Sequence, residues 1–178
     1  MQQAPVSLSH TGFHVFDMDK MVAFYTRVFG FHISDKADDG RITFMSADPK
    51  DHHQLIMFKG RTAKAGETHF AHVAFRVRDM DTLRAIGKRL TSETEVKDVR
   101  TVTHGNAWSI YFQDPEGNTA EAFVDTPWHV AQPFLKPIDL NQSDKELAAW
   151  TDKMLDEFPT KRPFDDWRQD FAKKLGID

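Results

Sequence analysis

The hydrophobic pattern of this chain alternates between two periodicities. Apolar and polar residues alternate at 8–16 and again at 70–78, which predicts a strand at each place. Apolar residues with helical spacing follow each strand, over about 19–29 and 81–90. Short apolar runs bounded by turn residues predict further strands at 41–46, 53–58, 96–103, 107–113 and 119–125. We therefore expect the order strand, helix, three strands, occurring twice.

The two halves of this region are copies of one sequence motif. The ten residues from His10 to Asp19 match those from His72 to Asp81 at six positions. Both segments end in Asp-Met-Asp, which is typical of the start of a helix. An Asp-Pro pair precedes the last strand of each copy, in the same order along the chain. We interpret 1–125 as one domain of two modules, about 6–60 and 68–125.

Residues 126–178 lie outside this repeat and are rich in aromatic side chains. They contain three of the four tryptophans, and prolines interrupt them. Helical patterns run over 144–158, opened by Ser143 as a cap, and over 164–175. The first helix is expected to bury a stripe of Trp150, Met154, Leu155 and Phe158. This helical extension should pack on the core or on a neighbouring subunit. The fold class is therefore α+β.

Composition excludes several classes of function. The 23 basic and 27 acidic residues give a net charge of −4, which argues against nucleic-acid binding. No apolar run is long enough to cross a bilayer, and the first residues lack the features of a signal peptide. We therefore expect a cytoplasmic protein without membrane contact. With no cysteine and nine histidines, any metal would have nitrogen and oxygen ligands.

Two histidines occupy equivalent positions in the repeat. His10 and His72 each stand at the start of the first strand of a module, and Glu121 lies on the last strand of the second module. A single histidine at such a position is more often structural than a ligand. If the modules pack about a pseudo-twofold axis, however, equivalent positions can converge. Two histidines and one carboxylate form the facial set typical of non-haem Fe(II) oxygenases.

These residues resemble motifs of the vicinal oxygen chelate superfamily, over about 8–125. The segment from Tyr111 to Glu121, which contains Asp-Pro-Glu-Gly-Asn, carries the most specific likeness. The chain looks most like a single-domain type I extradiol ring-cleaving dioxygenase. The resemblance implies two tandem βαβββ modules that form a cupped mixed sheet around a metal. It also implies that His10, His72 and Glu121 bind Fe(II), or Mn(II), which accepts the same ligands.

The same resemblance implies roles for three further side chains. His53, the second member of a His-His pair, would be the catalytic acid–base group. Tyr111 and His104 would face the substrate. The partners would be a small aromatic diol and O₂, and we expect a homo-oligomer.

Other activities of the superfamily stay open at this point. Isomerases of the glyoxalase or epimerase type usually take a fourth ligand from the last strand of the first module. Ile56 stands at the aligned position and cannot bind metal, although Gln54 is near. A thiol-transferase resistance enzyme and a metal-free binding module are the remaining alternatives.

Overall fold

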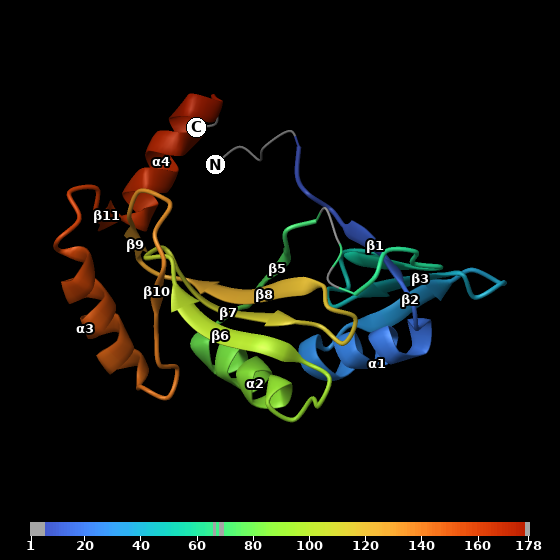
Figure 1. The fold of residues 1–178 in the computed structure, drawn as a ribbon. Coiled ribbons are helices and arrows are strands. Elements are labelled where there is room, and N and C mark those ends of the chain that lie inside the picture. Colours follow the sequence, from blue (N-terminus) through green and yellow to red (C-terminus); the bar gives the residue numbers. More distant parts are fainter. Residues whose placement is uncertain (1–5, 66, 68–69, 177–178) are drawn as a thin grey trace.

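The first module places one helix against a four-stranded sheet (Figure 1). The computed structural model describes residues 6–65, 67 and 70–176. This module consists of β1 (Thr11–Val15), α1 (Met18–Phe29), β2 (His32–Lys36), β3 (Ile42–Ser46) and β4 (Leu55–Lys59). The sheet order is β1-β4-β3-β2, and only the pairing of β1 with β4 is parallel. Strand β2 was not predicted, because all five of its residues are exposed and give no apolar pattern.

The second module repeats this arrangement. It consists of β5 (Val73–Arg76), α2 (Met80–Leu90), β6 (Lys97–Thr103), β7 (Ala107–Gln113) and β8 (Thr119–Asp125). Its sheet order is β10-β6-β7-β8-β5, and β5 pairs with β8 in parallel as β1 does with β4. The predicted α+β class and βαβββ order are confirmed. In the described residues, the cupped mixed sheet consists of two separately hydrogen-bonded sheets, with β1 and β5 each at an edge.

Local capping sets the helix ends as the sequence predicts. The Asp17 side chain accepts the Lys20 N–H at the start of α1, and Asp79 accepts the Thr82 N–H at the start of α2. Gly30 ends α1 with φ of 76°, a left-handed conformation that glycine adopts without strain. The helices therefore begin and end where the chain supplies their missing backbone partners.

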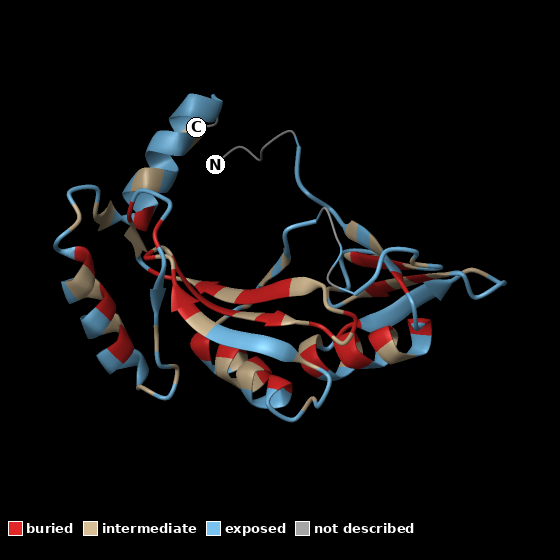
Figure 2. Ribbon diagram, viewed as in Figure 1, coloured by how far each residue is buried: buried red, intermediate tan, exposed pale blue. Residues whose placement is uncertain are grey.

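The two modules share one hydrophobic core. The Phe29 ring of α1 lies 4.7 Å from the Phe75 ring and 5.9 Å from the Phe112 ring, centroid to centroid, so it contacts two strands of the second module. Buried residues line the helix faces that turn toward the sheets (Figure 2). This contact fixes the second sheet relative to the first module.

The Asp114–Asn118 turn, whose sequence carries the strongest motif, has a structural role. The Asp114 carboxylate accepts the backbone N–H groups of Glu116 and Asn118 and the hydroxyl of Tyr25. Burial raises the pKa of Asp114 above its ordinary value. The turn thus binds the second module to α1 of the first.

The extension packs at the end of the second sheet that lies away from the first module (Figure 1). It contains β9 (Trp128–His129), β10 (Lys136–Pro137), α3 (Asp144–Leu155), β11 (Arg162–Pro163) and α4 (Phe164–Leu175). Strand β10 pairs with the free edge of β6. Helix α3 begins at the Ser143 cap, as expected. The predicted stripe through Trp150 is wrong, because α3 buries Leu147, Thr151 and Leu155 while Trp150 is 40% exposed.

Helix α4 matches the predicted range, and its buried packing is concentrated at its N-terminal end. Phe164 is buried, whereas the rest of the helix extends away from the sheet (Figures 1 and 2). No helix in the described ranges combines the length and apolar character needed to cross a membrane.

Candidate functional site

Three strands of the second sheet bring polar side chains to one face. In the strand register, Arg100 of β6 faces Tyr111 of β7, and Tyr111 faces Glu121 of β8. His72, just before β5, places its Nε2 atom 3.3 Å from Oε2 of Glu121. Because alternate residues of a strand share a face, Ile110 and Phe112 point to the helices while Tyr111 points away from them. The sheet thereby holds a carboxylate, a phenol and an imidazole together.

His104 joins this group from the end of β6. Its Nδ1 lies 2.9 Å from the carbonyl oxygen of Phe134. Since a carbonyl oxygen only accepts, Nδ1–H donates, and Nε2 of the neutral ring remains an acceptor. The Tyr111 hydroxyl lies 3.1 Å from that Nε2 and donates to it. The extension therefore sets the orientation of His104 through a backbone atom.

The electrostatics of the group favour a protonated tyrosine beside a carboxylate. Burial raises the pKa of Tyr111, and the negative charge of the neighbouring Glu121 raises this pKa further. Glu121 is 6% exposed, with its other oxygen 3.9 Å from Nε2 of His104. A buried carboxylate that faces two imidazoles is a suitable pair of oxygen donors for a divalent metal.

His10 and His53 form a second group, on the first module. Their ring centroids are 4.5 Å apart, and Nδ1 of His53 lies 2.9 Å from Nδ1 of His52. Desolvation lowers the pKa of the half-buried His53, and positive charge on His10 or His52 lowers it further. His53 is therefore a neutral imidazole at neutral pH, which can accept a proton.

The two groups do not form one metal site within a single chain. In the part of the chain that is described, no group of three or more histidine, aspartate or glutamate side chains is placed to hold a metal ion. His72 and Glu121 come together as the resemblance implies, with Tyr111 and His104 beside them. His10 and His53 come together on the other sheet.

Comparison with known families identifies the superfamily of the chain but not its specific reaction. Residues 7–122, more than half of the chain, match the model of the Glyoxalase/Bleomycin resistance protein/Dioxygenase superfamily. The chain belongs to this superfamily. No curated protein matches it.

Solved structures of the superfamily share its fold. FosX, a fosfomycin resistance protein from Listeria monocytogenes, was solved with Mn(II) and dihydroxypropylphosphonic acid. It is 22% identical, the match covers 67% of this chain and 90% of that chain, and the TM-score is 0.53. FosX from Mesorhizobium loti is 25% identical; the match covers 67% of this chain and 92% of that chain, and the TM-score is 0.52. Lactoylglutathione lyase from Agrobacterium tumefaciens is 22% identical; the match covers 68% of this chain and 96% of that chain, and the TM-score is again 0.52.

Sequence reasoning missed two features beside this cluster. One is Arg100, which lines a cavity of about 410 Å³ with Tyr111. The β6–β7 hairpin register was the signal that could have placed Arg100 opposite Tyr111. The other is the Phe134 carbonyl on His104, which no sequence motif marks because any residue supplies a carbonyl.

Replacement of His53 by alanine should leave metal affinity intact and lower turnover by about 10²–10⁴-fold, the usual contribution of an acid–base group. His52→Ala is the matched control, since His52 is more exposed and it is the His53 ring that lies 4.5 Å from the His10 ring. Metal titration and steady-state kinetics of both variants, on a substrate of the wild-type protein, check this prediction. Equal losses at the two positions would mean that the pair is structural.

Proposed function

We propose that the protein is a metal-dependent enzyme that acts on a small molecule with two adjacent oxygen atoms. One divalent metal would be held by His10, His72 and Glu121. The observation that carries the proposal is the cluster of His72, Glu121, Tyr111 and His104 on one face of the second sheet. A buried carboxylate beside an imidazole, with a protonated phenol next to it, suits metal binding and proton transfer.

Each residue of the cluster would have a distinct task. When bound, the metal would supply Lewis acidity toward substrate oxygens. Tyr111 keeps its proton and could redirect it from His104 Nε2 to a substrate oxygen bound beside Glu121. His104 Nε2 accepts from Tyr111 in the structure and could take up a proton through it. His53, with its lowered pKa, would be a second proton acceptor.

A second copy of the chain would bring His10 to this cluster. His10 precedes β1 and His72 precedes β5, and among the described residues each of these strands lies at the edge of its sheet with one side unpaired. Such edges readily pair with another chain. If β1 of one copy lies along β5 of the other, the two repeat-equivalent histidines come to the same place. Twofold symmetry then generates two identical sites per dimer.

A non-oxidative reaction has the better support. The similar structures include fosfomycin resistance proteins and a lactoylglutathione lyase. Ile56 stands where a fourth ligand is expected in isomerases, and the Gln54 side chain is hydrogen-bonded to Ala47 N–H. A three-ligand site favours a resistance-type reaction, in which a thiol or water opens a small electrophile, over an isomerase.

Extradiol ring cleavage is the second candidate. Two histidines and one carboxylate, without a fourth protein ligand, are also typical of Fe(II) oxygenases. The His104–Tyr111 pair lies beside Glu121, where it could hydrogen-bond a catechol oxygen bound at the metal. Both reactions thus use the same residues, and they differ in the requirement for Fe(II) and O₂.

Reaction with matched co-substrates separates the two candidates. The protein is loaded with Mn(II) or, without air, with Fe(II). It is then tested for loss of fosfomycin with water, cysteine or glutathione, and for O₂ uptake with catechols. Metal-dependent opening of the epoxide with no O₂ uptake is the expected result. O₂ uptake with Fe(II) and a catechol would establish the second candidate instead, and metal-loaded protein inert in every assay would contradict both.

A further inference from the structure

Arg100 is the one arginine of the described chain whose guanidinium group has neither an ion pair nor a hydrogen bond. Eight of the other nine pair with carboxylates, and Arg89 donates to the carbonyl of Val28. The Arg100 guanidinium instead lies over the Tyr111 ring, 5.2 Å from its centroid. This contact holds the cation in place while leaving its five N–H donors free.

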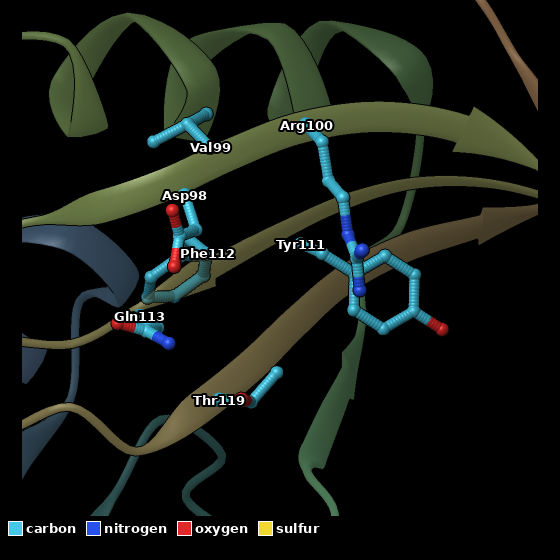
Figure 3. A pocket seen from close by; sticks show the side chains of 7 residues that line it. All are labelled: Asp98, Val99, Arg100, Tyr111, Phe112, Gln113 and Thr119. Carbon is cyan, nitrogen blue, oxygen red and sulfur yellow. The ribbon is translucent and has the colours of Figure 1, made fainter. Parts of the chain in front are cut away.

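Figure 3 shows how Arg100 lies in the cavity. Its side chain lies against Tyr111 at one end, whereas Asp98, the carboxylate among the lining residues, lies near Gln113 at the other. Asp98 is held there by a positive φ of 53°, within an irregular stretch of β6. The end of the cavity nearest to Glu121 is therefore the cationic end.

Arg100 lies within reach of a small substrate at the proposed metal. Arg100, Tyr111 and Glu121 occupy one row across three neighbouring strands. Strands are spaced about 4.8 Å apart, so the Cα atoms of Arg100 and Glu121 are about 10 Å apart. A substrate whose oxygens lie at the metal held by Glu121, and whose negative group is a few bonds away, spans that distance.

We propose that Arg100 binds a negatively charged group of the substrate, a carboxylate, phosphate or phosphonate. The inference rests on the proposed function, since it takes the substrate oxygens to lie at His72 and Glu121. The planar guanidinium matches two oxygens of such a group at once. Arg100 is thus a specificity-determining residue, and neutral diols are the poorer ligands of this site.

Two matched pairs of ligands test the proposal. Catechol and protocatechuate differ by a carboxylate, and propylene glycol and dihydroxypropylphosphonic acid differ by a phosphonate. Calorimetry measures the binding of each to the Mn(II)-loaded protein. Charge-assisted hydrogen bonds predict that at least one anion of the two pairs binds about tenfold more tightly than its neutral partner. Arg100→Gln should abolish that preference by weakening the binding of the anion.

Arg76→Gln is the control for the loss of an arginine. Arg76 also lies over an aromatic ring, Phe123, but it is paired with Asp125 at 3.6 Å. This variant should keep the preference of the wild-type protein, and Arg100→Lys should keep part of it, because a lysine retains the charge but not the planar fork. A preference that survives in Arg100→Gln, or is absent from the wild type, would overturn the proposal.

A metal-free measurement separates this inference from the proposed function. Inorganic phosphate is titrated into the protein without metal, and the Nε–H resonance of Arg100 is followed by NMR. A saturable shift that Arg76→Gln keeps would support the anion site even if no metal binds. Failure of Mn(II) to bind would then count against the proposed function alone, whereas an unresponsive Arg100 would count against this inference alone.

Discussion

Truncation of the chain after Asp125 should give an insoluble or molten product, although it leaves both repeated modules intact. The reason is that the extension covers surfaces of the second module. Strand β10 closes the edge of β6, and Trp108 of β7 donates its indole N–H to the buried Thr151 hydroxyl at 3.0 Å. Val130, Phe134 and Leu155 form a second buried cluster. Gly105, in a left-handed conformation, packs against Val130.

The magnitude of this loss is comparable to the stability of a whole domain. Burial of one large apolar side chain stabilises by about 1.5–3 kcal/mol. Truncation would remove the burial of three such side chains, expose Trp108 and leave the edge of β6 unpaired. Together these losses represent much of the usual free energy of unfolding of a domain, about 5–15 kcal/mol. Loss of the Phe134 carbonyl would also release His104 from its orientation.

Far-UV and near-UV circular dichroism with thermal melting check this prediction. Truncation after Arg168 is the control, because it keeps the buried Phe164 and the ion pair between Arg168 and Asp125. The control should fold and melt cooperatively. A chain that ends at Asp125 and melts like the full protein would show that the extension does not support the core.

Replacement of Glu116 by alanine should cost about 3–5 kcal/mol, the usual effect of removing one partner of a buried ion pair. Its carboxylate accepts the backbone N–H groups of Phe16 and Asp17, at 2.7–2.9 Å, just before α1. It also lies 3.8 Å from Arg61, and both side chains are at most 5% exposed. At the junction of the modules, the substitution would leave two backbone N–H groups without their acceptor. It would also remove the negative charge beside the buried Arg61 guanidinium, which keeps its hydrogen bonds to the Glu116 carbonyl and to Asn118.

Denaturant unfolding of Glu116→Ala and Glu95→Ala measures the effect. Glu95 pairs with Lys20 at 2.8 Å, but its side chain is 56% exposed, so its loss should cost about 0–1 kcal/mol. Glu116→Gln keeps the shape and one acceptor oxygen, and should fall between the two variants. Equal midpoints for Glu116→Ala and Glu95→Ala would show that the junction does not depend on this carboxylate.

Local signals predicted most of the fold. Asp17, Asp79 and Ser143 cap helices where the sequence places them, since a cap depends on the residues of one turn. The sheet face on which Tyr111 and Glu121 lie also follows from alternation. The α3 stripe was misjudged because Thr151 finds a buried partner in Trp108, which local periodicity does not reveal.

The parts of the site that the sequence did not predict depend on pairing between strands far apart in the chain. The motif predicted His72 beside Glu121, and the structure places them 3.3 Å apart. The position of His10 depends on which strand lies beside β1. The sequence repeat shows that His10 and His72 are equivalent positions, but it does not show whether the strand beside β1 belongs to the same chain or to a second copy. Arg100 was missed because its place in the cavity depends on the β6–β7 pairing and on a ring contact.

Mn(II) binding by a co-expressed pair of variants tests the shared site. His10→Ala and Glu121→Ala chains carry different affinity tags, and the mixed dimer is purified through both. Each variant alone lacks one ligand in every site. In the mixed dimer, one site combines His10 of the Glu121→Ala chain with His72 and Glu121 of the other. His14→Ala, which changes an exposed histidine of β1, is the control.

The measurement is the number of bound Mn(II) ions per dimer, by electron paramagnetic resonance. We expect two ions for the wild type and for His14→Ala, none for either ligand variant alone, and one for the mixed dimer. Full occupancy in dimers of Glu121→Ala would contradict the assignment of the metal ligands. A mixed dimer without metal, beside a wild type with two ions, would contradict a site shared between copies.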